Sequence, residues 1–196
     1  MKTFNTNQLL DDLKQITENN ITLITKKFSH LSDEQKKWRP TSDSWNILEV
    51  FSHLNVYAKF YHTTFIDKIQ KTKFKVAKDT FVSSPLGRSA WKSMKLGRAN
   101  NVKRKFKAPK NYNPSNDESL ISNDAISEFS ENQKQLLDIL EMAKQVNLRK
   151  VKIPISISKI VRLRLGDALM FVIYHDERHV QQALNILTHP KFPKKK

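Results

Sequence analysis

GDALMFVIYHDERHVQQALNIL, residues 166–187, is a helical pattern close to the carboxyl end of the chain. Its apolar residues recur every three or four positions, which is the period of a helix with one buried face. Two histidines four residues apart stand on that face, where successive turns bring their side chains together. The predicted inward stripe consists of Ala168, Phe171, Val172, His175, His179, Gln182, Ala183 and Ile186.

Three further segments show the same period, over about residues 5–29, 46–71 and 122–140. Almost none of the remaining sequence alternates in the way that a half-buried strand would. Long helices joined by polar breaks, without strands, are typical of a helical bundle. The sequence therefore predicts an all-α fold, an antiparallel four-helix bundle, with a long basic connection between the second and third helices.

The second of these helices has a clear start. Asn46 is an N-cap residue, and Glu49 three positions later completes a capping box. Trp45 precedes the cap and is placed to pack against Val50 as a hydrophobic staple. We therefore expect the helix to begin directly after Asn46 and to extend to about Lys71.

The connection between the second and third helices is strongly basic. Residues 85–117 contribute +8 of the net charge of +16, contain three prolines and lack a sustained period. We expect a long irregular segment with one short helix around Trp91. Residues 151–166, VKIPISISKIVRLRLG, indicate a second, extended connection. The basic residues of the first connection are Arg88, Lys92, Lys95, Arg98, Lys103, Arg104, Lys105, Lys107 and Lys110.

Length and composition limit the organisation and the chemistry. The 196 residues fit one domain, predicted over 1–190, with a disordered basic tail at 191–196. The absence of cysteine excludes disulfides, a thiolate nucleophile and cysteine-ligated metals, and three glycines cannot build a P-loop or a dinucleotide fingerprint. Neither a signal peptide nor a run that spans a bilayer is visible, so we expect a cytoplasmic protein without a membrane partner.

His175 and His179 have the spacing by which a helix can bind one metal ion through two imidazoles. A third ligand can come from the second helix, where His53 shares a stripe with Val50 and Tyr57. Three neutral imidazoles leave coordination positions open for water or substrate, as in catalytic sites. We therefore predict a divalent-metal site of His53, His175 and His179. The alternative is that these histidines pack in the core without a metal.

Two segments give the sequence a resemblance to a known family. One is WNILEVFSHL at residues 45–54, preceded by WRP at residues 38–40. The other combines LGD at residues 165–167 with HxxRHxxQ at residues 175–182. Together they resemble the DinB/YfiT-like metal-binding four-helix bundles, and the resemblance covers most of residues 1–187.

This resemblance implies a site and a class of reaction. In that family one histidine of the second helix and two of the fourth bind a divalent metal, and these positions match His53, His175 and His179. Nickel or zinc is the first expectation, with iron and manganese as alternatives. Relatives include thiol S-transferases that use bacillithiol and mycothiol-dependent maleylpyruvate isomerases. We therefore expect a thiol S-transferase or hydrolase that uses a metal-activated thiolate or water. It would act on a small molecule, take a low-molecular-weight thiol as a further cofactor and form a homodimer.

Three further polar residues are candidates near the metal. Asp176 follows His175 at the position where zinc peptidases with the HExxH motif carry their general base, so it is a candidate catalytic carboxylate. Glu49 lies one turn before His53, and Gln182 lies three residues after His179. Either side chain could orient a ligand from outside the coordination shell.

Two other functions remain open from the sequence alone. The first is a basic helical protein that binds nucleic acid, since its lysines attract phosphates and Trp91, Phe106 and Tyr112 could stack on bases. No sequence-reading motif accompanies this charge, which makes nucleic acid the less favoured partner. The second is a metal-binding dimer without catalytic turnover.

Overall fold

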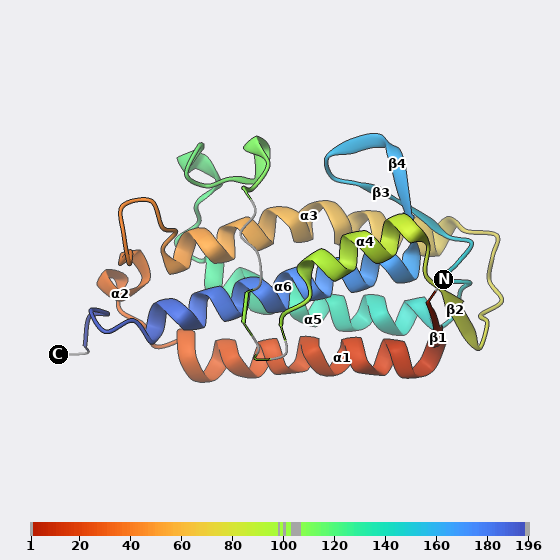
Figure 1. Cartoon of the computed structure of the whole chain (residues 1–196), viewed down its shortest axis with the longest axis horizontal. Coiled ribbons are helices and arrows are strands. Elements are labelled where there is room, and N and C mark those ends of the chain that lie inside the picture. Colours follow the sequence, from red (N-terminus) through yellow and green to blue (C-terminus); the bar gives the residue numbers. More distant parts are fainter. Residues whose placement is uncertain (1, 98, 100, 103–106, 195–196) are drawn as a thin grey trace.

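The computed structural model describes residues 2–97, 99, 101–102 and 107–194, apart from the side chain of Lys159. The protein is mostly helical, and its four longest helices lie alongside one another (Figure 1). Helix α3 packs against α5 and α6, and α1 packs against the same two helices from the other side. These helices are α1 (Thr6–Leu23), α3 (Ile47–Lys71), α5 (Ala125–Ala143) and α6 (Leu165–Leu187).

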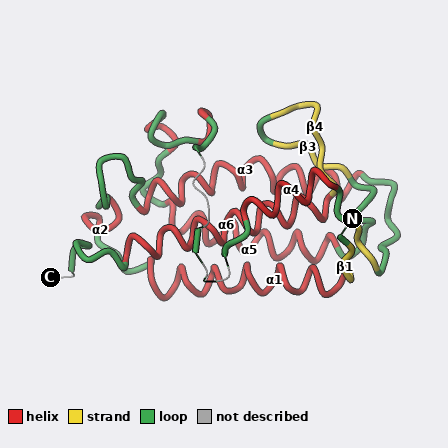
Figure 2. The backbone as a smooth tube through the Cα atoms, viewed as in Figure 1, coloured by secondary structure: helices red, strands yellow, loops and turns green. Residues whose placement is uncertain are grey.

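The remaining elements are shorter than these four helices, which form the helical body. Two two-stranded antiparallel sheets, β1 with β2 and β3 with β4, lie toward the same end of the molecule (Figure 2). Helix α1 continues as a π-helical turn, and two 3-10 turns precede α5. These elements are β1 (Thr3–Asn5), the π-helical turn (Ile24–Phe28), α2 (Asp33–Lys37), β2 (Thr80–Val82), α4 (Pro85–Met94), the 3-10 turns (Lys110–Tyr112 and Glu118–Leu120), β3 (Lys152–Ile155) and β4 (Ser158–Arg164).

The prediction of an all-α fold is therefore incomplete, because it missed both sheets. The extended segment 151–166 folds into the β3–β4 hairpin, which places Ile153 opposite Leu163 and buries both side chains. The alternating pattern of this segment has the two-residue period of a strand with one buried face. Pro154 lies in β3, immediately before the register shift in the pairing.

The expected short helix around Trp91 is α4, and the Trp91 side chain is buried in the core. Helix α4 packs against α6, so this part of the connection is structured and belongs to the helical body. The basic residues Arg98, Lys103, Arg104 and Lys105, together with Phe106, lie outside the described residues.

The capping box at the start of α3 forms as the sequence predicts. The Asn46 side chain accepts a hydrogen bond from the Glu49 amide at 2.9 Å, and Glu49 Oε2 accepts one from the Asn46 amide at 2.8 Å. Glu49 is buried and also pairs with Arg39, whose Nη1 lies 2.6 Å from Glu49 Oε2. These contacts fix where α3 begins and thereby set the rotation of the helix two turns later, at His53.

Asp167 fixes the start of α6. This buried carboxylate accepts hydrogen bonds from the Ser83 hydroxyl at 2.5 Å and from the amide and hydroxyl of Ser84 at 3.0 and 2.8 Å. A Cβ at Gly87 would lie 2.1 Å from the Asp167 Cγ, so only glycine allows this approach. The Leu165-Gly166-Asp167 part of the family-like motif therefore anchors α6 to α4.

A polar layer crosses the helical body between two apolar clusters. On α6 one cluster ends at Tyr174 and the other begins at Val180, and on α3 the two clusters meet between Leu54 and Tyr57. Within the layer, Asn20 donates to Gln133 Oε1 at 3.1 Å, and Gln133 donates to Asp176 Oδ2 at 2.8 Å. All four long helices contribute to this polar layer, which contains Thr17, Asn20, His53, Gln133, His175, Asp176 and His179.

The carboxyl-terminal segment 191–196, expected to be disordered, is described as far as Lys194. The ring of Phe192 packs edge-on to Trp38 with centroids 5.5 Å apart, and the Gln35 side chain donates to the Pro193 carbonyl at 2.9 Å. The described part of the segment therefore contacts α2 and the residue that follows it. Lys195 and Lys196 lie outside the described residues.

No helix in the described part of the chain is long and apolar enough to cross a membrane.

His62 lies in the interface between α3 and α5, away from the polar layer. Its ring is buried, and its Nδ1 lies 3.0 Å from the Gln135 Oε1. An amide oxygen only accepts, so Nδ1 carries the proton. Burial lowers the pKa of His62 to about 4, although the bond to Gln135 opposes the shift. The folded protein therefore holds this imidazole in its neutral form.

This depressed pKa makes His62 a source of acid sensitivity. The imidazole takes up a proton near its ordinary pKa of 6.5 in the unfolded chain and only near pH 4 in the folded chain, so stability present above pH 6.5 is lost as the pH falls. His62→Asn keeps a donor near Nδ1 but does not titrate. Between about pH 7 and pH 5, we expect the wild type to lose about 2 kcal/mol more free energy of unfolding than the variant. Urea denaturation at both pH values measures this, and equal losses in the two proteins would contradict it.

Candidate metal centre

Three histidine rings from two helices meet in the polar layer. His53 comes from α3, and His175 and His179 come from successive turns of α6. One ring nitrogen of each lies within 4.8 Å of those of the other two, and Nε2 of His53 lies 3.2 Å from Nε2 of His175. His53 and His175 are buried and His179 is half-buried. The structure thus brings together the three side chains that the sequence analysis selected.

Hydrogen bonds fix the tautomer of two of these rings. His53 Nδ1 lies 2.5 Å from the carbonyl oxygen of Tyr112, and His179 Nδ1 lies 2.9 Å from Oε1 of Gln182. Both partners are oxygens that only accept, so each Nδ1 carries the proton and donates it. The Nε2 atoms of His53 and His179 are therefore left with free lone pairs, the form in which imidazole binds a metal.

The contact between His53 and His175 fits a shared cation. Since His53 Nε2 has no proton, the 3.2 Å contact is either a hydrogen bond from His175 Nε2 or two lone pairs that face one ion. Nitrogens about 2.0–2.1 Å from a tetrahedral zinc ion lie roughly 3.3 Å apart. Nδ1 of His175 is buried and has no hydrogen-bond partner among the described residues. The geometry and the donor set therefore suit a divalent metal held by three imidazoles.

The electrostatics of the site keep all three rings neutral. Burial lowers the pKa of His53 to about 4, against the opposing effect of its bond to Tyr112. Burial, reinforced by the neighbouring imidazoles, holds the pKa values of His175 and His179 well below the usual range. Neutral imidazole is the form that ligates a metal, so no proton has to be displaced from these rings at neutral pH.

Aromatic rings surround the three histidines. The Trp45 ring lies 4.9 Å from His53 and stacks on His179 at 5.9 Å between centroids. The Tyr57 ring lies 4.5 Å from His175 and 5.0 Å from His53. These rings shield the imidazoles from water and strengthen electrostatic interactions at the site.

The accessory candidates have different positions. Gln182 contacts the site directly through His179. Glu49 binds the Asn46 amide and Arg39, and no hydrogen bond joins it to His53 among the described residues. Asp176 accepts from Gln133 instead of joining the histidine group. Burial raises the pKa of Asp176 to about 7, and the bond from Gln133 opposes this shift.

Two contributors to the site, Tyr112 and Trp45, carry no sequence motif that marks them as such. Tyr112 acts through its backbone carbonyl, which no side-chain motif can reveal. Trp45, expected only as a staple onto Val50, also packs its ring against His53 and His179, and its Nε1 donates to the Ser115 hydroxyl at 2.8 Å. The one available signal for Trp45 was its position directly before Asn46, the N-cap of the helix that carries His53.

Comparisons with known proteins concern the same residues. A family model described as the DinB superfamily matches residues 16–183, a range that contains all three histidines. The chain is 26% identical over 157 residues to the uncharacterized protein YuaE of Bacillus subtilis (strain 168). That similarity covers 80% of this chain and 85% of YuaE. No solved structure matches the chain.

The bond from His179 to Gln182 gives a test of the site with a matched control. Gln182→Ala removes the acceptor that orients the ring, and we expect zinc to bind about 10- to 100-fold more weakly. Gln181→Ala removes the neighbouring amide, which bonds to Asn185 instead, and should leave the affinity unchanged. Competition with a chromogenic chelator measures both. Equal affinities in the two variants would contradict the role of Gln182.

Proposed function

The chain belongs to the DinB superfamily, and from this premise we propose that it is an antiparallel four-helix-bundle enzyme dependent on a divalent metal. His53, His175 and His179 hold the metal in this proposal. The observation that carries it is the meeting of three neutral imidazoles, two of them oriented through their Nδ1 protons. Imidazole ligands suit nickel and zinc, which we favour, and also iron; manganese, which prefers oxygen ligands, remains an alternative.

The proposed reaction is substitution on a small-molecule substrate. A thiol, in thiol S-transfer, or water, in hydrolysis, gives up its proton and bonds to the electrophilic atom, and the leaving group departs with the electron pair of the broken bond. A divalent cation with three imidazole ligands keeps open coordination positions and lowers the pKa of a bound thiol or water. A low-molecular-weight thiol is the further cofactor in the transfer reaction. As in the sequence analysis, we propose that the protein works as a homodimer.

The chain's own residues orient the ligands and limit access. The Tyr112 carbonyl and Gln182 hold the rings of His53 and His179, so that their Nε2 lone pairs point to a common position. Burial raises the pKa of Tyr57, so its hydroxyl keeps its proton at neutral pH. Its ring packs on His175 and closes one side of the site.

Asp176 has no catalytic role in this proposal. Its carboxylate is buried and accepts from Gln133, which is itself held by Asn20. These bonds join α1, α5 and α6 through the polar layer. The residue that follows His175 is thus a structural member of that layer.

The metal content of the purified protein tests this function at its first step. Protein expressed without a histidine tag should contain a stoichiometric divalent metal, and His53→Ala should lose it. His30→Ala removes an exposed histidine and should retain the metal. Mass spectrometry of the digested protein measures the metals. Stoichiometric metal in His53→Ala would refute the proposed ligand set.

Turnover tests the second step. The metal-loaded protein should couple low-molecular-weight thiols to electrophilic acceptors, or hydrolyse the acceptors with water. The His53→Ala variant should do neither. Loss of thiol and appearance of product are followed by chromatography. Failure of the metal-loaded protein across a broad panel of thiols and acceptors would instead support a metal-binding dimer without turnover.

A further inference from the structure

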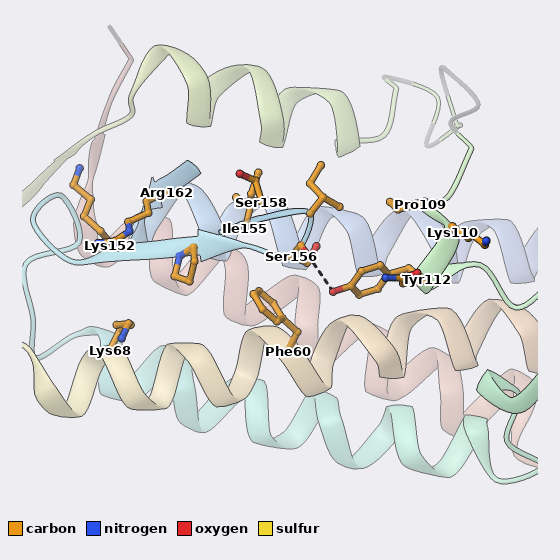
Figure 3. A pocket seen from close by; sticks show the side chains of 13 residues that line it. Phe60, Lys68, Pro109, Lys110, Tyr112, Lys152, Ile155, Ser156, Ser158 and Arg162 are labelled. Atoms are coloured by element: carbon orange, nitrogen blue, oxygen red, sulfur yellow. Dashed lines mark hydrogen bonds between the residues drawn. The ribbon is translucent and has the colours of Figure 1, made fainter. Parts of the chain in front are cut away.

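A pocket of about 900 Å³ lies on the α3 side of the helical body, beside the metal centre. Figure 3 shows it between the β3–β4 hairpin, helix α3 and the 3-10 turn Lys110–Tyr112. The Tyr112 hydroxyl donates to the Ser156 carbonyl at 3.5 Å and so links the turn to the hairpin. The pocket is thereby bounded by three elements that are distant in the sequence.

The charge of this pocket has one sign. Four of its lining side chains are cationic, Lys68, Lys110, Lys152 and Arg162, and its lining contains no carboxylate. Lys68 pairs with Asp67 at 2.9 Å, whereas the other three form no ion pair with any described residue. Burial lowers the pKa of Lys152, and the nearby Arg164 lowers it further. Lys110, Lys152 and Arg162 thus have no described carboxylate within ion-pair distance, and a bound anion would supply this counter-charge.

The remaining surface of the pocket is largely apolar. Phe60 and Ile155 line it together with Pro109 and Pro154, and the Tyr112 ring forms one wall. Figure 3 shows Phe60 on α3, with Lys152 and Arg162 on the hairpin and Lys110 beside Tyr112. A ligand that fits must therefore present an anionic group to the cations and an apolar part to these rings.

We propose that this pocket binds a small anionic molecule that carries a phosphate or carboxylate group next to an apolar or aromatic part. Its volume lies within the range of about 300–1,000 Å³ that is usual for small-molecule sites. The hairpin and the turn bound it on two sides above α3, which favours a compact ligand over a nucleic-acid duplex. The proposal rests on the pocket and does not require the metal.

Tyr112 joins this pocket to the metal centre. Its ring lines the pocket, and its carbonyl accepts a hydrogen bond from His53 Nδ1. The Tyr112 ring also lies 4.5 Å from the Tyr57 ring, which contacts His175. If the proposed function holds, the pocket holds the anionic part of the substrate, beside the histidines that bind the metal.

Calorimetric titration with phenyl phosphate tests the pocket directly. The protein is first treated with a chelator, so that binding to a metal cannot contribute, and is then compared with untreated protein. We expect saturable binding in both, weakened about three- to tenfold in Arg162→Gln. Lys59→Gln removes the same charge from an exposed position on α3 that does not line the pocket, and it should bind as the wild type does.

Further titrants separate the possible anions. Phenylacetate in place of phenyl phosphate shows whether a carboxylate or a phosphate is preferred, and either preference with the same dependence on Arg162 supports the proposal. Inorganic phosphate and benzyl alcohol should each bind more weakly than the combined ligand. Lys152→Gln repeats the test at a second position, with thermal melting as the check on folding.

Three results would overturn the proposal. The first is no binding of any anionic titrant by the chelator-treated protein. The second is equal weakening by Arg162→Gln and Lys59→Gln, which indicates attraction by net charge alone. The third is displacement of phenyl phosphate by a short DNA duplex whose own binding depends on Arg162, which would identify a nucleic-acid surface.

Discussion

The contact between His53 and His175 is the constraint on which the site depends. Two imidazole nitrogens lie 3.2 Å apart between two apolar clusters, where an unpaired polar group costs about 1–3 kcal/mol. Bonds to the Tyr112 carbonyl and to Gln182 satisfy Nδ1 of His53 and His179, and bonds that cross between helices satisfy Asn20, Gln133 and Asp176 in the same polar layer. Two adjacent residues of helix α6 therefore have different polar partners. His175 faces the other imidazoles, and Asp176 accepts a hydrogen bond from Gln133.

This arrangement requires that α3 and α6 are set accurately along their axes and in rotation. The capping box at Asn46 and Glu49 fixes the start of α3, and Asp167 fixes the start of α6 against Ser83 and Ser84. Each anchor lies about two turns before the first histidine of its helix. Residues that resemble a family motif but bear no ligand atom thus gain a physical role, because they position those that do.

The parts of the fold that follow from local chemistry could be predicted from the sequence. Helical periodicity located the long helices, and the pattern at Asn46 gave the capping box and the start of α3. The four-residue spacing of His175 and His179 placed both on one face, and the stripe through Val50 and Tyr57 selected His53. The parts that depend on distant segments could not be predicted. The bond from His53 to the Tyr112 carbonyl joins residues 59 positions apart, and the pairing of β1 with β2 and the Gln133 partner of Asp176 likewise join distant segments.

Anomalous X-ray diffraction from crystals of the protein, collected across the absorption edge of the metal found in solution, tests the central claim most directly. The account predicts a single strong peak within bonding distance of the Nε2 atoms of His53 and His179 and of a ring nitrogen of His175, at roughly 2.0–2.1 Å if the metal is zinc. A peak ligated by other residues would contradict it. The absence of any anomalous peak between the three histidine rings, in crystals grown with excess metal, would also contradict it.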